Sequence, residues 1–307
     1  MCGRLALAAL LCCVLLPSVA AAETLRLVRW GAPGAERPGL IDGDDVLRDL
    51  SGVVDDLAGP VLGRLDELAA LDPAGLPRVP GEPRLGPPVG GVGKIIALGF
   101  NYADHAAESE VELPTEPLLF SKAVTALAGP RDPIVPPRGS TKLDYEAELV
   151  IAIGRRARYV SVAEATDFIA GFAAGHDVSE RAFQRERGGQ FLKGKSADGF
   201  APLGPWLVPA AQIADVQALD VFSRVNGEPR QRSNTRHMVF PAAFAVSYVS
   251  RFMTLEPGDL IFTGTPAGVG AGMDPPRWLR TGDVVEIGIE GLGVQRQAIA
   301  APEPPGP

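Results

Sequence analysis

The sequence predicts an α+β fold in which β-structure dominates, and three observations support this class. The 307 residues contain 36 glycines and 29 prolines, a content that predicts many turns between short strands. Segment 144–153 ends in an apolar run rich in β-branched residues, Leu149–Ile153, as expected for a buried strand. Residues 220–225 and a polar segment flank Asn226 and Gly227, a strong signal for a hairpin with a two-residue turn.

The other elements follow from apolar periodicity and turn signals. Short apolar pieces at residues 25–30, 38–43 and 46–50 precede a short helix expected near 61–70. Further strands are expected at 94–98, 118–120, 168–174, from 260 and at 283–289, with a helix over 240–252. Residues 74–93 are dense in proline and glycine and indicate a linker. We therefore expect a small β-rich N-terminal domain over 23–73, this linker, a larger domain over 94–300 and a disordered tail over 301–307.

The first 22 residues have the layout of a secretory signal peptide. Arg4 precedes an uncharged apolar run over 5–16, and small residues at Ala20–Ala22 offer a cleavage site. We expect cleavage after Ala22 and export to the periplasm or the medium. An uncleaved membrane anchor is one alternative, and a misassigned start codon, which would leave a cytoplasmic protein, is another. All three cysteines lie in this leader (Cys2, Cys12 and Cys13), so the mature chain would contain neither thiol nor disulfide.

Charge and hydropathy exclude two classes of partner. The formal net charge is −8, and an acidic chain is a poor candidate for nucleic acid binding, which depends on neutralising phosphates. After the leader, no apolar run approaches the length that crosses a bilayer. We therefore expect neither nucleic acid nor, after cleavage, a membrane as a partner.

Two carboxylates stand at the start of the predicted buried strand. Glu146 and Glu148 are two positions apart, so on a strand both side chains leave from one face. Adjacent negative charges resist burial unless a cation lies between them, and oxygen-only ligands favour Mg²⁺, Mn²⁺ or Ca²⁺. Two solvated acids at a strand end are the alternative. Asp177 follows another predicted strand, a usual place for a third ligand or a helix cap. On a helix begun there it would share a face with Arg181 and Gln184.

His105 and Glu108 follow the predicted strand at 94–98. Asn101 or Asp104 could cap a short helix there, on which residues three apart are neighbours. A carboxylate beside an imidazole orients the ring and raises its basicity, which suits a general base that activates water. A capped surface helix with an incidental pair is the alternative interpretation.

Residues 189–196 (GQFLKGKS) fit the P-loop pattern letter for letter. A phosphate-binding loop needs an apolar strand before it and a helix after it, whereas charged residues precede this segment and two prolines follow it. We therefore reject nucleotide binding and interpret Lys195 as a lysine in a tight glycine turn, available to an anionic oxygen. A second glycine-rich loop, 264–270, exposes backbone N–H groups that suit a carboxylate. His176 and His237 have no recognisable partner set and are expected to be structural.

Six segments, taken in order, resemble the fumarylacetoacetate hydrolase family. They are Gly99–Glu108 (GFNYADHAAE), Asp144–Leu149 (DYEAEL), Asp177–Arg181 (DVSER), Gly194–Ser196 (GKS), Val225–Glu228 (VNGE) and Gly264–Gly270 (GTPAGVG). The resemblance covers about residues 94–299, and it favours the functional interpretation of the acids and of the histidine–glutamate pair over the alternatives above. Segments 185–190 and 234–238 resemble the subgroup that hydrolyses 2,4-diketo-3-deoxy sugar acids.

The resemblance implies a mixed β-sandwich roll, a catalytic domain over 94–300, one divalent ion (usually Mg²⁺ or Mn²⁺) and a homodimer. It implies a small 2-oxo acid as substrate: hydrolysis of the C–C bond of a 2,4-dioxo acid, an acylpyruvate or 2,4-diketo-3-deoxy sugar acid, would yield pyruvate and a carboxylic acid. One alternative is isomerisation or decarboxylation of a 2-hydroxyhepta-2,4-dienedioate in aromatic degradation. Another is a non-catalytic exported protein that binds dicarboxylates.

The resemblance also implies a role for each matching residue. The metal ligands would be Glu146, Glu148 and Asp177. The catalytic residues would be His105 and Glu108, which activate water, and Lys195, which stabilises the developing oxyanion, while substrate contacts would come from Arg181, Gln184 and Thr265. The animal enzyme for which the family is named has a fourth carboxylate ligand seven residues before the histidine, where this chain has Leu98. Three carboxylates are therefore expected, as in the acylpyruvase-like branch.

Overall fold

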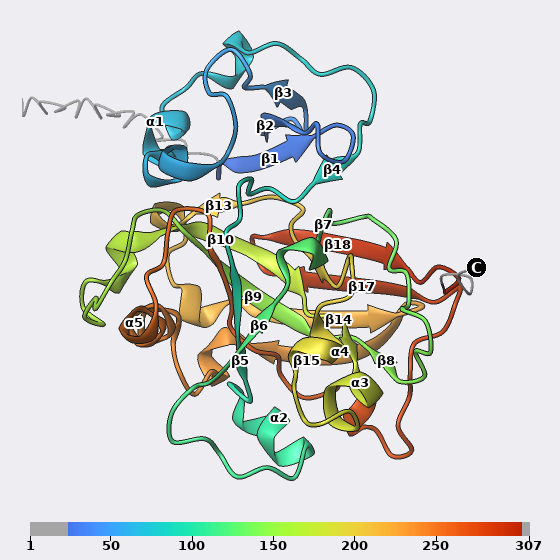
Figure 1. Ribbon diagram of the computed structural model, residues 1–307. Helices are drawn as coiled ribbons and strands as arrows, with labels where there is room; N and C mark the ends of the chain where they lie inside the picture. Colours follow the sequence, from blue (N-terminus) through green and yellow to red (C-terminus); the bar gives the residue numbers. More distant parts are fainter. Residues whose placement is uncertain (1–23, 303–307) are drawn as a thin grey trace, which may run out of the picture.

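The computed structural model describes residues 24–302 (Figure 1). The predicted leader with its three cysteines lies outside the described residues, as does most of the predicted tail. Within the described residues, no helix is long and apolar enough to span a membrane.

The N-terminal part forms a four-stranded antiparallel sheet in the order β3-β2-β1-β4, at the top of Figure 1. Its strands are β1 (Arg26–Trp30), β2 (Arg37–Ile41), β3 (Leu47–Asp49) and β4 (Leu85–Gly86). A 3-10 helix (Gly59–Gly63) and α1 (Leu65–Ala69) follow β3, at the position predicted for a short helix. β4 comes from the proline-rich segment 74–93 and pairs with β1, so this segment contributes a strand as well as a connection.

A six-stranded mixed sheet forms the centre of the rest of the chain, in the order β13-β10-β9-β16-β5-β6. Its strands are β5 (Ile95–Gly99), β6 (Leu118–Lys122), β9 (Ala147–Ile153), β10 (Ile169–His176), β13 (Val208–Pro209) and β16 (Leu260–Phe262). Every residue of β9 and β10 is buried, which explains why both read as continuous apolar runs. The sheet is antiparallel except between β16 and β5.

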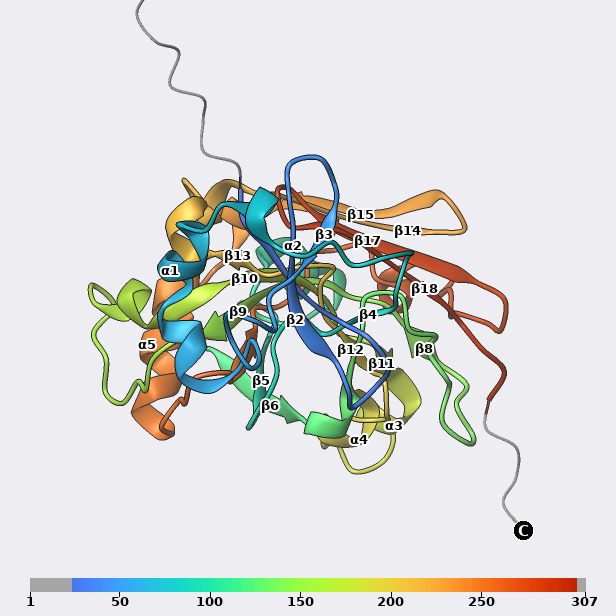
Figure 2. The same ribbon diagram turned by 90° about the horizontal axis from the view of Figure 1, so that it is seen from above.

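A second, antiparallel sheet has the order β15-β14-β17-β18 and contacts β9 and β10 through β14, β17 and β18. Figure 2 shows its strands side by side along one side of the molecule: β14 (Asp220–Val225), β15 (Glu228–Asn234), β17 (Val284–Ile289) and β18 (Gly293–Ala298). The predicted hairpin is confirmed: Asn226 (φ 53°) and Gly227 (φ 81°) form the turn between β14 and β15. The two packed sheets make the predicted mixed β-sandwich.

Shorter elements surround the sandwich. The helices are α2 (Ala103–Glu108), α3 (Arg181–Arg185), α4 (Leu192–Lys195) and α5 (Ala242–Phe252). Two short strand pairs join β7 (Leu127–Ala128) to β12 (Ala201–Pro202), and β8 (Leu143–Asp144) to β11 (Ser179–Glu180). Short 3-10 turns lie at Pro73–Gly75, Val124–Ala126, Ala165–Phe168, Ala210–Gln212, Val216–Ala218, Thr235–His237 and Gly270–Gly272. α4 lies inside the P-loop-like segment 189–196, a conformation that a phosphate-binding loop does not have.

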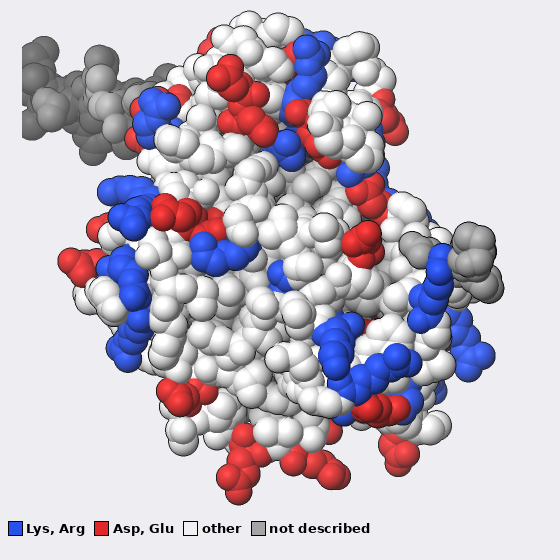
Figure 3. All heavy atoms as spheres, in the orientation of Figure 1, with Lys and Arg blue, Asp and Glu red and all other residues white. Residues whose placement is uncertain are grey.

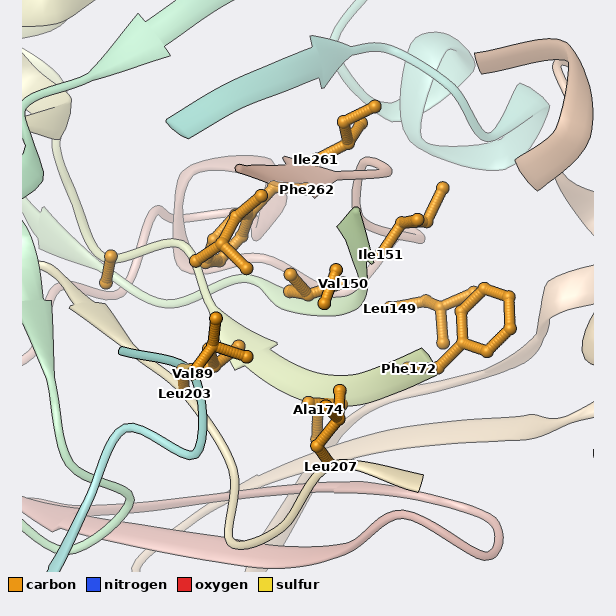
Figure 4. Packing of buried hydrophobic residues seen from close by; sticks show 14 of the residues in the cluster. Val89, Leu149, Val150, Ile151, Phe172, Ala174, Leu203, Leu207, Ile261 and Phe262 are labelled. Carbon is orange, nitrogen blue, oxygen red and sulfur yellow. The ribbon is translucent and has the colours of Figure 1, made fainter. Parts of the chain in front are cut away.

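The core lies around β9, β10 and β16, where apolar side chains of both sheet faces are buried (Figure 4). Leu149, Val150, Ile151 and Phe262 are at most 1% exposed, and burying each such side chain contributes about 1.5–3 kcal/mol. Gly175 belongs to this packing, since a Cβ there would lie 2.3 Å from Val150 Cγ2. Close packing at Gly175 brings the end of β10 against β9, and that end leads directly to Asp177.

His176, the last residue of β10, is buried between the sheets, and its Nδ1 lies 3.0 Å from Oε1 of Gln297. This amide oxygen can only accept, so Nδ1 carries the proton. Burial, with a smaller contribution from Lys122, lowers the pKa of His176 to about 4 against the opposing effect of the hydrogen bond with Gln297. Nε2 has no hydrogen-bond partner among the described residues. His176 is therefore a neutral core residue, in keeping with the structural role expected for it.

This burial predicts a pH dependence of stability. The folded pKa lies below the unfolded value of 6.5, so the unfolded chain binds a proton first and the protein loses stability as pH falls from 6.5 to 4. The shift corresponds to about 3 kcal/mol. Urea unfolding of wild type and His176→Asn across this pH range checks the prediction. We expect the free energy of unfolding to fall less steeply with falling pH in the variant, by the amount that one bound proton contributes. Equal pH dependence in the two proteins would contradict the prediction.

Candidate active site

The segment that carries His105 is anchored by a buried asparagine. The side-chain amide of Asn101 donates to the carbonyl oxygens of Thr263 (2.7 Å) and Phe240 (3.0 Å), and its oxygen accepts from the N–H of Phe240 (2.7 Å). The suggestion that Asn101 or Asp104 caps the helix is wrong. Tyr102 is the N-cap residue and its side chain makes no capping bond, while the side chain of Asn101 makes these long-range contacts instead.

His105 and Glu108 form the predicted pair on α2. Nδ1 of His105 lies 3.1 Å from Oε2 of Glu108, whose Oε1 accepts from the backbone N–H of Gly268 (2.8 Å). The imidazole is 5% exposed and stacks on Phe100 with ring centroids 5.8 Å apart. Because a carboxylate at Nδ1 holds the proton there, Nε2 is left as the acceptor, as a general base requires.

The three acids predicted as metal ligands are brought together at the end of the β9–β10 pair. Ala147 pairs with His176 in the register of the two strands, so Glu146, just before β9, meets Asp177, just after β10. Glu146, Glu148 and Asp177 are at most 4% exposed, and one oxygen of each lies within 4.8 Å of the others. Asp177 precedes the helix α3, so the predicted common helical face with Arg181 and Gln184 is wrong.

Three buried cations contact these acids. Lys195 Nζ lies 2.5 Å from Glu146 and 2.8 Å from Asp177, and Arg181 donates to Glu146 (2.6 Å). Lys122, fully buried at the end of β6, pairs with Asp177. Lys122 was not among the predicted site residues, although its position after the apolar residues of a strand could have indicated an inward-facing lysine. Burial opposes the charge of Lys195, but Asp177 and Glu146 raise its pKa.

Glu148 is the acid that these cations leave uncompensated. It accepts a hydrogen bond from the N–H of Gly264 (2.8 Å) and forms no ion pair within residues 24–302. Burial, together with the charges of Asp177 and Glu146, raises the pKa of Glu148 well above its usual range. For Glu146, Arg181 and Lys195 outweigh burial and lower the pKa. A buried, oxygen-only donor set in which one carboxyl group, Glu148, has no cationic partner fits a hard divalent cation.

The glycine-rich loop after β16 binds carboxylates of the protein itself. The N–H of Gly264 donates to Glu148 and that of Gly268 to Glu108, each at 2.8 Å. The N–H of Gly270 donates to Asp144 (2.7 Å), the acid that also accepts from Arg181 Nε (2.8 Å). The sequence correctly indicated carboxylate recognition by this loop, but it could not show that these carboxylates belong to residues more than 100 positions away.

All nine predicted site residues lie at or beside one pocket. Seven line it directly: His105, Glu146, Glu148, Arg181, Gln184, Lys195 and Thr265. Glu108 and Asp177 contact this lining through His105 and Lys195. Its free volume is about 20 Å³, because the surrounding side chains nearly fill it. Arg185, which was not predicted, also lines the pocket, as do Phe120 and Phe191, whose ring centroids lie 5.4 Å apart.

A larger cavity of about 640 Å³ lies elsewhere, between the N-terminal part and the strand β10. It is lined mainly by small and apolar residues, together with the charged residues Asp66, Arg155, Asp167 and Asp215. No histidine, lysine or cluster of potential metal ligands lies in this cavity, and the described residues contain such a cluster only at Glu146, Glu148 and Asp177. The chemistry therefore points to the smaller pocket.

Comparison with known proteins shows the family. The sequence model of the fumarylacetoacetate (FAA) hydrolase C-terminal domain matches residues 94–300. The chain belongs to the fumarylacetoacetate hydrolase family. A Burkholderia multivorans protein that is named only as a hydrolase is 51% identical over 280 residues, which cover 90% of this chain and 99% of that protein.

Solved structures of family members share the fold. A fumarylacetoacetate hydrolase from Exiguobacterium antarcticum superposes with a TM-score of 0.81 at 36% identity, covering 91% of this chain and 100% of the other. A Mycobacterium abscessus protein, named as a 2-hydroxyhepta-2,4-diene-1,7-dioate isomerase, superposes with a TM-score of 0.80 at 34% identity, covering 92% and 100%. The family thus includes proteins named for different reactions, and the reaction of this chain depends on its own site.

Proposed function

We propose that the chain is a divalent-metal-dependent hydrolase that cleaves the C–C bond of 2,4-dioxo acids to pyruvate and a carboxylic acid. One observation carries this proposal: three buried acids, of which Glu148 has no cationic partner, converge at the same pocket as a histidine oriented by a glutamate. A site that only bound an acid would need the cation but not the base.

His105 is the proposed base that activates water. Its Nε2 is free to take a proton because Glu108 holds the proton on Nδ1, and Gly268 holds Glu108 in place. The water attacks the 4-carbonyl of the substrate. Lys195, which lines the same pocket, would donate a hydrogen bond to the oxygen on which negative charge develops.

Cleavage of the C3–C4 bond leaves a pyruvate enolate, which must be stabilised and then protonated. Glu146, Glu148 and Asp177 would hold Mg²⁺ or Mn²⁺, with Ca²⁺ also compatible, and the ion would supply Lewis-acid stabilisation of this negative charge. Arg181 and Gln184 line the pocket next to these acids and would position the substrate carboxylate. Thr265, in the glycine-rich loop 264–270, also lines the pocket and would contact the substrate.

Isomerisation or decarboxylation of a 2-hydroxyhepta-2,4-dienedioate is a second candidate, because the same stabilised enolate serves these reactions. It is favoured by the structural neighbour that is named as such an isomerase. A non-catalytic exported protein that binds dicarboxylates is a third candidate, and the oriented His105 argues against it.

One assay separates these candidates. Metal-free protein, prepared with a chelator, is expected to be inactive, and Mg²⁺ or Mn²⁺ is expected to restore the loss of enol absorbance of 2,4-dioxo acids together with release of pyruvate. Loss of absorbance without pyruvate would support isomerisation. Binding of the acids without any change in absorbance would support the third candidate, and equal activity with and without metal would refute the proposed cofactor.

We also propose that the protein is a homodimer. Figure 3 shows a face on which charged side chains lie mainly at the rim and few lie in the centre. β6 is the edge strand of the six-stranded sheet, and Leu118 and Val124, on and after it, are about 40% exposed. Light scattering coupled to gel filtration is expected to give the mass of two chains, and the mass of one chain would contradict the proposal.

Export through the leader is a further proposal, supported by the layout of residues 1–22. N-terminal sequencing of the protein from its native host is expected to show a mature start at Glu23 in the exported fraction. Retention of Met1 in the cytosol would reject it.

A further inference from the structure

Gln231 is a buried residue to which the proposed chemistry gives no role. It belongs to β15 in the second sheet and is 1% exposed. Its Oε1 accepts from the N–H of Ala147 (3.0 Å) and from the hydroxyl of Ser223 (2.9 Å). Its Nε2 donates to Thr265 Oγ1 (2.7 Å) and to the carbonyl oxygen of Pro266 (2.8 Å). The amide therefore uses two acceptor and two donor positions in a completely buried setting.

Two of these partners determine which way the amide faces. The N–H of Ala147 can only donate and the carbonyl of Pro266 can only accept, so a flipped amide would place donor against donor and acceptor against acceptor. Because Nε2 donates to the Thr265 hydroxyl, that hydroxyl gives its own proton to the carbonyl of Ala147 (2.9 Å). The Thr265 side chain thus offers the pocket an acceptor and not a donor.

These bonds hold the backbone between two candidate metal ligands. Ala147 stands between Glu146 and Glu148, and its N–H and C=O are bound by Gln231 and Thr265. The carbonyl of Glu146 shares a peptide unit with the N–H of Ala147 and accepts from the N–H of Asp177 (3.0 Å). One peptide unit therefore links the backbones of Glu146 and Asp177 to Gln231, and its rotation would move both glutamate side chains.

We propose that Gln231 is a positioning residue, which holds this peptide unit so that Glu146 and Glu148 converge with Asp177 on one cation. The same amide sets the Thr265 hydroxyl as an acceptor toward the pocket. Gln231 does not line the pocket itself, so it acts through Ala147 and Thr265. The inference rests on the proposed metal site and extends it to a residue of the second sheet.

The test compares Gln231→Met with Gln295→Met by calorimetric titration of Mn²⁺ into the chelator-treated full chain. Gln295 is an equally buried glutamine of the same sandwich, and it donates to the carbonyls of Ala174 (3.0 Å) and Gly204 (3.4 Å) without touching a candidate ligand. Methionine has nearly the volume of glutamine, which limits repacking. Thermal unfolding of each variant reports the general loss of stability.

We expect Gln231→Met to weaken Mn²⁺ binding by about 10- to 100-fold, as is typical of residues that support metal ligands. Gln295→Met should lower Tm by a similar amount but leave the Mn²⁺ affinity unchanged. Wild-type affinity in Gln231→Met, or an equal loss in Gln295→Met, would overturn the inference. A wild-type protein that binds no Mn²⁺ would refute the proposed metal site itself.

If Gln231→Met does not fold, Ser223→Ala replaces it in the test. The Ser223 hydroxyl donates to Oε1 of Gln231 and accepts from its backbone N–H (3.1 Å), so its loss loosens the amide of Gln231 without replacing any candidate ligand. Weaker Mn²⁺ binding is expected, and unchanged affinity would overturn the inference.

Discussion

Replacing Glu148 with glutamine is expected to weaken Mn²⁺ binding by more than about 100-fold, beyond the 10- to 100-fold range typical of residues that only support a ligand. As a consequence, the turnover of 2,4-dioxo acids by this variant should fall below detection. Glu148 is the acid that Lys122, Lys195 and Arg181 leave uncompensated, so it provides the negative charge that a cation must neutralise. The amide oxygen of the new glutamine can still accept from Gly264, so the local fold should persist.

The stability of metal-free Glu148→Gln shows whether Glu148 serves as a metal ligand or supports the fold. Burial, Asp177 and Glu146 raise the pKa of Glu148, so its charged form is unfavourable without a cation, and the metal-free Glu148→Gln variant should be as stable as wild type or more stable. Glu186→Gln is the matched control, since it removes one negative charge from an exposed residue near α3 that pairs with Lys142. Wild-type Mn²⁺ affinity in Glu148→Gln, or a strong loss of stability, would show that Glu148 is not a ligand.

Replacing His105 with glutamine is expected to lower kcat by about 10²- to 10⁴-fold, the usual contribution of a general base. Mn²⁺ affinity should stay unchanged, because the three acids keep their contacts. Glu108→Gln should give a smaller loss, and the double variant should be no slower than His105→Gln, since Glu108 acts through the imidazole.

The control for this pair is His237→Gln, which alters an exposed histidine that contacts Ser233. Single-turnover kinetics with a 2,4-dioxo acid, together with Mn²⁺ titration, measure the two effects separately. Normal kcat in His105→Gln would mean that another group activates the water. A joint loss of kcat and metal affinity would instead assign His105 to the metal site.

Local signals explain most of what could be predicted. The β14–β15 hairpin follows from two residues with positive φ, and β9 and β10 follow from apolar runs that both faces of the sheet bury. The convergence of Glu146 with Asp177 depends on the pairing register of these strands, which the sequence alone does not show. The family resemblance implied that the three acids form one ligand set, and the structure places them together.

Two features could not be predicted from local sequence patterns: the strand β18 and the long-range contacts of Asn101. β18 was missed because Gln295 and Gln297 occupy its buried positions, so its apolar alternation is absent. The helix-capping expectation for Asn101 was wrong because its amide bonds to residues about 140 and 160 positions away. Local propensity cannot anticipate such partners.

Main-chain donors in the loop 264–270 limit how this enzyme's specificity could be redesigned. A backbone N–H cannot be exchanged for another chemical group, and a side chain at Gly268 (φ 103°) would place its Cβ 2.3 Å from the carbonyl oxygen of Arg230. A change at Gly268 would shift Glu108, the partner of His105, and a change at Gly264 would shift the proposed metal ligand Glu148. Arg185, Phe120 and Phe191 line the same pocket and are not held by these backbone N–H groups, so engineering for a different acyl group would begin with them.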